Sequence, residues 1–330
     1  MKAIAVINGA LHDVNLPEPQ PQGRDLVVKV EAISVNPIDY KQRKAAPHDG
    51  EPHVVGWDVA GTVSAVGPEA SLFKVGDAVY YAGSLVRAGA NSEWHAVDER
   101  IVGRKPASLG MEQAAALPLT SITAWEALFE RLGVSRSGAD QGKSVLIVGG
   151  AGGVGSIAIQ LAKKLAKLTV VATASRPASR EWCTALGADH VIDHHGDMPA
   201  QLAALGLAEV DYILCLNDIN LHFAALATAI APQGKICAIV RNERPLPMDL
   251  LFAKSATMVF ELMFTRSMFG TPDMIEQHNL LNDVAQLVDA GVLKTTVGES
   301  GGRIDAASLA RAHAALEAGS TIGKIVLSGF

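Results

Sequence analysis

Residues 144–155 have the sequence SVLIVGGAGGVG, in which an apolar, β-branched run leads directly into closely spaced glycines. The residues that follow, 156–164, have a helical pattern, so the stretch predicts a strand, a tight turn and a helix in that order. Glycines at the spacing of the dinucleotide-binding fingerprint allow a tight turn, the approach of a pyrophosphate to backbone N–H groups, and close packing of helix on strand. A cofactor site is therefore predicted at Gly150, Gly152 and Gly155, together with the neighbouring Gly153 and Val154.

A single fingerprint is weak evidence, so the pattern around it decides its meaning. From about residue 122 to residue 258, strand-like and helix-like segments alternate, which predicts a doubly wound, Rossmann-type unit with a parallel sheet. Three of the helices are expected to end in glycine, at Gly187, Gly206 and Gly234. The predicted strands span residues 145–148, 169–172, 190–192, 210–214 and 235–240, and the predicted helices span residues 153–166, 179–186, 198–205 and 222–230.

The segments on either side follow other patterns. Residues 1–121 consist of short strands broken by turn residues, with period-two alternation over residues 26–33, and predict a mainly β unit. Residues 259–330 contain two helix-like stretches and a short apolar strand at 323–327, which we expect to return to the first unit. The predicted fold class is therefore α/β, with a mainly β domain and a Rossmann-type domain.

The composition excludes several classes of protein. The chain has 330 residues, of which 49% are hydrophobic and 19% charged, as in an ordinary globular enzyme. A net charge of −6 argues against a nucleic-acid surface, and no apolar run is long enough to span a membrane. The three cysteines have no paired spacing, so we expect a reducing, cytoplasmic location.

The end of the second predicted strand indicates which dinucleotide binds. An NAD site places Asp or Glu about twenty residues beyond the glycines, where it accepts hydrogen bonds from the ribose 2′-OH. Residues 173–176 read TASR instead. A carboxylate would repel a 2′-phosphate, whereas the Ser175 hydroxyl and the Arg176 guanidinium would bind it. We therefore predict NADPH; the alternative is that Arg176 is a solvated residue at a loop start.

Three further motifs make the chain resemble the medium-chain dehydrogenase/reductase superfamily. They are GWDVAGTV at 56–63, VGDAV at 75–79 and GKIV at 323–326. The resemblance covers essentially the whole chain. It implies a GroES-like catalytic domain at 1–121, a Rossmann NADPH-binding domain at 122–258, and a C-terminal return to the catalytic domain at 259–330.

The resemblance also implies where a catalytic zinc would be held. Zinc-dependent alcohol dehydrogenases of this superfamily use Cys, His and Cys, with the His in a Gly-His-Glu motif. Here the first Cys position matches Asn36, the His position matches Trp57 before Asp58, and no Cys lies near residues 117–123. The segment 83–94 also lacks the cysteines of a structural zinc lobe. Because zinc needs three or four close N, S or O ligands, we predict no metal site.

The run NPIDYKQR at 36–43 resembles that of enone and alkenal double-bond reductases. The candidate catalytic residues are Asn36, Tyr40 and Lys41. Tyr40 or Lys41 would stabilise negative charge on a carbonyl oxygen, and Asn36 would orient the carbonyl or the nicotinamide ribose. Which of Tyr40 and Lys41 faces the substrate stays open, and Lys41, Arg43 and Lys44 alternatively form the solvated face of a short helix. Asp39 is a candidate helix cap or a candidate partner for Lys41 or Arg43.

Four more residues complete the predicted cofactor site. Thr120 and Thr123 lie at the expected junction of the domains, where they would touch the nicotinamide or cap the next helix. Asn217 follows the strand predicted at 210–214. Lys324 resembles the terminal Gly-Lys of the superfamily that approaches a cofactor phosphate, and is otherwise an exposed strand residue.

The predicted function is an NADPH-dependent reductase that transfers hydride to a small-molecule enone or quinone without zinc. The alternatives are an acyl-thioester reductase of the same superfamily, an alcohol dehydrogenase with unexpected zinc ligands, and a non-catalytic NADPH-binding protein. A substrate pocket is expected among the loops 45–53, 85–92, 241–248 and 260–272. The apolar stretch 257–264 predicts an edge strand that pairs across a two-fold axis, and hence a homodimer.

Overall fold

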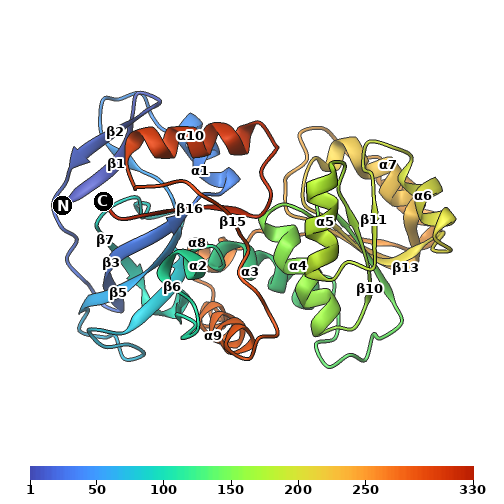
Figure 1. Cartoon of the computed structure of the whole chain (residues 1–330), viewed down its shortest axis with the longest axis horizontal. Coiled ribbons are helices and arrows are strands. Elements are labelled where there is room, and N and C mark those ends of the chain that lie inside the picture. The colour runs from blue at the N-terminus through green and yellow to red at the C-terminus, as the bar shows by residue number, and fades with distance from the viewer. The chain divides into compact units, whose positions relative to one another are not determined.

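The computed structural model describes all 330 residues and divides into two compact units (Figure 1). The first unit consists of Met1–Ile122 and Phe264–Phe330, and the second of Thr123–Met263. The second division lies at residue 263, later than the 258 expected from the sequence, because β14 (Thr257–Phe260) still belongs to the sheet of the second unit.

The first unit contains a large, mainly antiparallel sheet and a small one. The large sheet has the order β15-β16-β3-β5-β6-β8, with β7 paired to β3, and the small sheet has the order β2-β1-β4. The last strand, β16, pairs antiparallel with β3, so the C-terminal segment returns to the first unit as expected. The strands are β1 (Lys2–Ile7), β2 (Ala10–Asn15), β3 (Asp25–Ser34), β4 (His53–Val54), β5 (Asp58–Val66), β6 (Ala78–Ala82), β7 (Trp94–Asp98), β8 (Val102–Arg104), β15 (Val297–Ser300) and β16 (Lys324–Ser328).

Apolar residues of these strands form the core of the first unit, with Leu26, Val28 and Val30 of β3 among them. The alternation predicted over residues 26–33 is therefore one face of a half-covered sheet. Strands β3 and β5 approach so closely that a Cβ on Gly61 would lie 2.1 Å from the carbonyl oxygen of Lys29. The helices of this unit are α1 (Pro37–Ala45), η1 (Glu99–Ile101), α2 (Met111–Ala115), α8 (Thr265–Phe269), α9 (Glu276–Asp289) and α10 (Ala306–Glu317), and α3 (Pro118–Trp125) crosses the division.

The second unit is a doubly wound, all-parallel sheet with the order β11-β10-β9-β12-β13-β14. The chain winds outward from β9 to β11 and then returns to β12 on the other side of β9, as the alternating pattern predicted. The strands are β9 (Ser144–Val148), β10 (Thr169–Thr173), β11 (His190–Ile192), β12 (Val210–Cys215), β13 (Ile230–Ala238) and β14. The helical elements are η2 (Glu126–Arg131), α4 (Gly153–Lys164), α5 (Pro177–Leu186), α6 (Met198–Ala204), α7 (Ile219–Ala229) and η3 (Met248–Lys254).

The boundary between α7 and β13 differs from the prediction. Strand β13 begins at Ile230, so Gly234 lies inside the strand instead of ending a helix. Pro232 explains the early end of α7, because proline cannot continue a helix and disfavours helical geometry in the residue before it. By contrast, Gly187 is the C-cap of α5 with a φ of 113°, as expected for a glycine at that position.

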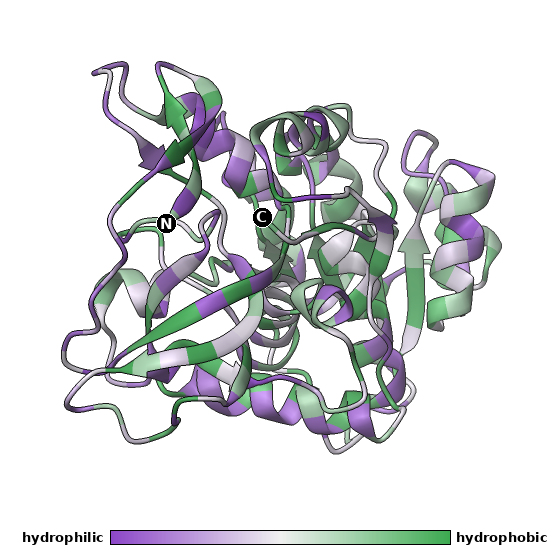
Figure 2. Cartoon of the chain, turned by 60° about the vertical axis from the view of Figure 1, so that its left-hand side comes forward, coloured by the Kyte–Doolittle hydropathy of each residue, from purple (hydrophilic) through white to green (hydrophobic).

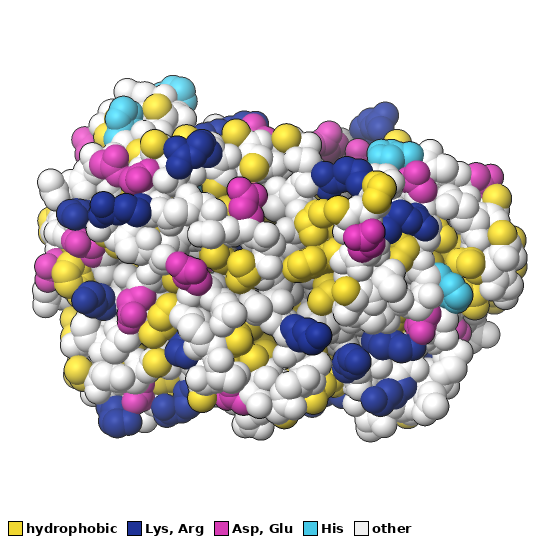
Figure 3. All heavy atoms as spheres, in the orientation of Figure 1, with side chains coloured by type: hydrophobic (Ala, Val, Ile, Leu, Met, Phe, Trp, Pro, Cys, Tyr) yellow, Lys and Arg dark blue, Asp and Glu magenta, His cyan; other side chains and the backbone are white.

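The surface of the chain is polar and mixed in charge. Figure 2 shows hydrophobic colour along the strands and alternating colours along the helices, the pattern of helices with one buried side. On the face drawn in Figure 3, Lys and Arg side chains are interspersed with Asp and Glu. No helix combines the length and the hydrophobicity needed to cross a bilayer.

Helix α1 begins with a buried carboxyl group. Asp39 is 1% exposed, and its Oδ2 accepts a hydrogen bond from the Asn36 N–H at 2.9 Å, while its Oδ1 is buried without a partner. Burial raises the pKa of Asp39 to about 7, although the Asn36 hydrogen bond and the Lys324 ammonium act in the opposite direction. The predicted cap is therefore present, and in the folded chain it holds a proton over a pH range in which an ordinary Asp does not.

We predict that Asp39→Asn changes how stability depends on pH. Because the folded state raises this pKa, the stabilisation from Asp39 is complete below the ordinary value near 3.8 and is lost as the pH rises through about 7. The free energy of unfolding of Asp39→Asn relative to wild type should increase by about 2–3 kcal/mol between pH 5 and pH 8. Urea unfolding at several pH values measures this difference. The exposed Asp249→Asn serves as the control, and parallel curves for wild type and Asp39→Asn would contradict the prediction.

Candidate active site

Helix α1 carries two of the three candidate catalytic residues. Tyr40 is half-buried and Lys41 is exposed. The Lys44 ammonium lies 5.4 Å from the centre of the Tyr40 ring, and both Arg43 and Lys44 form ion pairs with Glu317 of α10. The basic face of α1 is therefore divided: two of its cations are held by α10, and Lys41 is in contact with solvent.

Asn36, the third candidate, lies just before α1 and is 1% exposed. Its Nδ2 donates to Oδ2 of Asp58 at 2.8 Å, and its Oδ1 accepts from the Lys324 ammonium. The structure thus brings together two residues that the sequence assigned to different tasks. Asn36 was expected at the substrate or the ribose and Lys324 at a cofactor phosphate, whereas both are buried and bonded to groups of the first unit.

Trp57 is a packing residue in this unit. It is 3% exposed, its Nε1 donates to the Ser84 carbonyl at 3.0 Å, and its ring meets that of Phe264 edge-on at 6.1 Å. An indole in this position supplies no lone pair to a metal ion.

The glycine turn of the second unit has the steric character that the fingerprint requires. Strand β9 is buried throughout and is followed by Gly149 with a φ of 88°. A Cβ on Gly155 would lie 2.4 Å from the carbonyl oxygen of Gly149, and one on Gly150 would lie 2.8 Å from the Cβ of Ala172. A Cβ on Gly152, the N-cap of α4, would approach only the Gly149 oxygen, at 3.6 Å. The turn is thus tightly packed at Gly150 and Gly155, whereas there is free space beside Gly152 at the start of α4.

The open helix start suits an anion. The first N–H groups of a helix have no intrahelical partner, and the helix dipole adds positive potential there. Gly153, Val154 and Gly155 are the first residues of α4, so their N–H groups are those available to a phosphate. The turn is also fixed to β10, because the N–H groups of Gly149 and Gly150 donate to the side chain and backbone oxygens of Thr173.

Strand β10 ends at Thr173, and the residues after it carry no carboxylate before α5. Ser175 is half-buried, and Arg176, the N-cap of α5, is exposed. Arg180 was not predicted from the sequence. Its guanidinium donates to the carbonyl oxygens of Ala174 at 3.1 Å and Val191 at 2.5 Å. Its position one helical turn after Arg176 was the available signal. The end of β10 is thus flanked by two guanidinium groups.

The remaining cofactor candidates lie at two places. Asn217 is half-buried just after β12, the strand next to β9, at the carboxyl edge where the chain reverses its winding. Thr120 and Thr123 are both buried in α3 and fall on opposite sides of the division between the units. The Thr120 hydroxyl donates to the carbonyl of Leu117, the residue before α3, at 3.1 Å.

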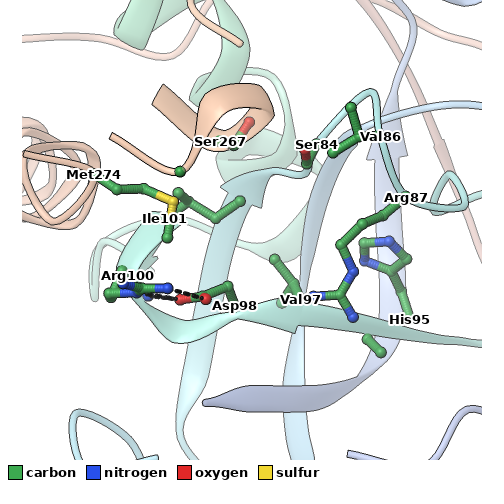
Figure 4. A pocket seen from close by; sticks show the side chains of 12 residues that line it. Ser84, Val86, Arg87, His95, Val97, Asp98, Arg100, Ile101, Ser267 and Met274 are labelled. Atoms are coloured by element: carbon green, nitrogen blue, oxygen red, sulfur yellow. Dashed lines mark hydrogen bonds and ion pairs between the residues drawn. The ribbon is translucent and has the colours of Figure 1, made fainter. Parts of the chain in front are cut away.

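A cavity of about 160 Å³ lies in the first unit (Figure 4). Two of the loops expected around a substrate contribute to it, through Val86 and Arg87 in one and Ser267 and Gly270 in the other. None of Asn36, Tyr40, Lys41 or Lys324 lines this cavity. Its two arginines are paired with acidic residues: Arg87 with Asp25 at 2.7 Å and Arg100 with Asp98 at 2.8 Å.

The three cysteines are free and buried in the second unit. Cys183 lies in α5, Cys215 in β12 and Cys237 in β13. Burial raises the pKa of Cys183 to about 11 and that of Cys215 and Cys237 to about 12. At neutral pH these thiols are protonated, which disfavours both nucleophilic attack and metal binding.

Comparison with known families and proteins gives consistent results over the whole chain. The model of the alcohol dehydrogenase GroES-like domain matches residues 22–118, and that of the zinc-binding dehydrogenase family matches residues 186–327. A zinc-type alcohol dehydrogenase-like protein of Staphylococcus aureus is 42% identical over 312 residues, which cover 94% of this chain and 92% of that protein. A chloroplast envelope quinone oxidoreductase homolog of Arabidopsis thaliana is 30% identical over 87% of this chain and 85% of that protein. The 2-methylene-furan-3-one reductase of Solanum lycopersicum is 39% identical over 54% of this chain and 47% of that protein.

Solved structures agree with these relatives. A candidate zinc-dependent alcohol dehydrogenase of Rhizobium etli CFN 42 has a TM-score of 0.96 and 51% identity, covering 100% of this chain and 98% of that one. The mycobacterial protein Rv1454c, complexed with NADPH, has a TM-score of 0.84 and 28% identity, with 100% of both chains covered. The chain therefore belongs to the medium-chain dehydrogenase/reductase superfamily and is an oxidoreductase of that family.

Proposed function

We propose that the chain is an NADPH-dependent reductase of α,β-unsaturated carbonyl compounds or quinones that works without zinc. The observation that carries the cofactor preference is the end of β10, where Ser175 and Arg176 stand in place of a carboxylate. Arg180, fixed to the carbonyls of Ala174 and Val191, adds a second positive charge there. The related mycobacterial structure that is complexed with NADPH supports the same choice.

The second unit fits a dinucleotide. The N–H groups at the start of α4, beside Gly152, would hold the pyrophosphate, and Ser175 and Arg176 would hold the 2′-phosphate. Asn217, Thr120 and Thr123 are our candidates for contacts to the nicotinamide half. When bound, the reduced nicotinamide supplies a hydride to the acceptor.

The names of a furanone reductase and a quinone oxidoreductase homolog among the relatives support an acceptor with a conjugated carbonyl. Reduction of such an acceptor leaves negative charge on its carbonyl oxygen. The exposed Lys41 ammonium or the Tyr40 hydroxyl would stabilise this charge, and Tyr40 or water would then protonate the α-carbon. Asn36 is buried in the first unit's polar network, so we assign it to holding the start of α1 and not to substrate contact.

The assay that tests the function follows NADPH oxidation with a set of simple enones and a set of quinones. Turnover with either set supports the proposal, and the comparison between sets identifies the acceptor class. Oxidation that requires an acyl thioester, or NADP⁺ reduction with simple alcohols, would replace it with another reaction of the superfamily. Binding of NADPH without turnover of any acceptor would leave a non-catalytic binding protein.

Arg176→Ala should weaken NADPH binding about tenfold and leave NADH binding unchanged, because an exposed charge-assisted contact to the 2′-phosphate contributes about 1.5 kcal/mol. Titration of nicotinamide fluorescence measures both dissociation constants. Arg303→Ala removes an equally exposed guanidinium from the first unit and should change neither. A wild-type protein that binds NADH as tightly as NADPH would refute the role of Ser175 and Arg176.

Lys41→Ala and Tyr40→Phe distinguish the two candidate donors. The variant that removes the group facing the carbonyl oxygen should lower kcat about 100-fold, the usual effect of losing one donor to a developing oxyanion. Loss of the proton donor should in addition change the pH dependence of kcat. Lys29→Ala, an exposed lysine of β3, is the matched control. If neither variant changes the rate, both residues are structural.

We also expect a homodimer that pairs through β14, the edge strand of the second unit's sheet. Phe260 of β14 is 50% exposed, and an exposed edge strand of this kind is a site for pairing with another chain. Phe260→Glu should therefore shift sedimentation from dimer toward monomer. Phe269→Glu, in which the phenylalanine is 75% exposed in the first unit, should not. A wild-type monomer at micromolar concentration would remove the idea.

A further inference from the structure

The first unit contains a lysine that is buried with all of its hydrogen-bond donors engaged. Lys324, the first residue of β16, is 3% exposed. Its ammonium donates to the Val35 carbonyl at 2.8 Å, to Oδ1 of Asn36, and to Oδ2 of Asp58 at 3.1 Å. An ammonium has three N–H bonds, so no donor remains for a ligand.

The carboxylate that pairs with this ammonium is equally engaged. Asp58, at the start of β5, is fully buried. Its Oδ2 accepts from the Ser34 hydroxyl and from Asn36 Nδ2, each at 2.8 Å, and its Oδ1 accepts from the Leu119 backbone N–H at 2.7 Å. The pair therefore joins the end of β3, the start of α1, the start of β5, helix α3 and strand β16.

The matching family and a relative have names that refer to zinc. Whether a zinc ion fits around Lys324 and Asp58 depends on the ligands that the surrounding residues offer. Zinc is held in proteins by thiolate, imidazole or carboxylate. Of these groups the network contains two carboxyls: Asp58, which is already paired with a cation, and Asp39, which accepts from the Asn36 N–H and whose pKa is raised by burial to about 7. The histidine of the neighbouring strand β7, His95, bonds to the Tyr81 hydroxyl at 2.9 Å and the Ala88 carbonyl at 3.1 Å. A dication here would have to displace the Lys324 ammonium, so these residues do not fit zinc.

We propose that the Lys324 ammonium takes the place of a metal ion in this unit, as a cation of the chain itself that cross-links five segments around Asp58. The two charges depend on each other. Removal of one partner leaves an unpaired charge without solvent, which is strongly destabilising, whereas removal of both leaves only lost hydrogen bonds. This cross-link belongs to the architecture of the first unit and does not depend on the cofactor or the acceptor proposed above.

The first test uses the wild-type, full-length protein. An amine-reactive acetylating reagent followed by peptide mass spectrometry should label the exposed Lys41 and leave Lys324 unlabelled until denaturant is added. After dialysis against zinc chloride and then buffer, elemental analysis should find no stoichiometric zinc, and a chelator should leave the Tm unchanged. Labelling of Lys324 as fast as Lys41, or one zinc per chain whose removal lowers the Tm, would overturn the proposal.

The second test is a double-mutant cycle of Lys324→Met and Asp58→Asn. Each single variant should lower the Tm by about 10 °C, and the double variant should lose less than the sum of the two. Lys74→Met and Asp77→Asn are the control pair, because they form an ion pair at 2.7 Å in which the Lys74 side chain is 82% exposed. Their losses should be small and additive. Additive losses at Lys324 and Asp58 would overturn the proposal, and if Lys324→Met does not fold, the wild-type measurements decide.

Discussion

The first unit depends on a buried pair of opposite charges, Lys324 and Asp58. Neither group is tolerated in a protein interior without a partner, because the loss of hydration far exceeds the net stability of a domain. Here each charge is satisfied by the other and by hydrogen bonds from Asn36 and the surrounding backbone. Since Asn36 is the residue before α1, the same pair anchors the helix that carries Tyr40 and Lys41. The position of these two candidate catalytic residues is therefore coupled to a contact made by the last strand of the chain.

The second unit depends on a steric constraint and not on charge. Gly150 and Gly155 lie where any side chain would collide with β10 or with the turn itself, so the backbone closes tightly and exposes the start of α4. A phosphate held by backbone N–H groups is recognised without regard to the rest of the cofactor. On the proposed function, discrimination between dinucleotides would then come from the end of β10. This explains why the chemistry of Ser175, Arg176 and Arg180 is informative while the glycines alone are not.

The sequence predicted the features that local patterns determine. The strand, turn and helix at 144–164, the alternating elements of the second unit and the cap formed by Asp39 all depend on residues close together in the chain, and the structure contains each of them. The helix predicted to end at 230 ends at Ala229, but Gly234 was wrongly predicted to terminate it, since Pro232 follows closely and Gly234 lies inside β13. An edge strand was predicted at 257–264, where β14 lies, but the division was placed at 258 because local patterns do not show which sheet a strand joins.

No local pattern predicts the partners of Lys324, because the contacts join residues that are 266 to 289 positions apart. A lysine in an apolar strand has no local signal for burial, and the usual expectation is an exposed ammonium. The signal that existed was the coincidence of three departures from the zinc-dependent pattern: Asn36 for a cysteine, Trp57 for a histidine, and no cysteine near residue 119. Each departure removes a metal ligand, and together they leave the buried Asp58 carboxylate in need of another cation.

Two lysines of the first unit differ in how far their charge is compensated: Lys324 has a carboxylate partner, and Lys41 takes no part in the ion pairs of α1. The charge of Lys324 is compensated within 3.1 Å by Asp58, so it has little field beyond its own network. On α1, Glu317 compensates Arg43 and Lys44, while Lys41 takes part in none of these ion pairs. An uncompensated cation keeps its attraction for a negative charge that develops nearby, which is the property that an enolate-forming reduction requires of its enzyme. On the proposed function, the buried lysine would maintain the architecture, and the exposed Lys41 would be the cation available beside Tyr40.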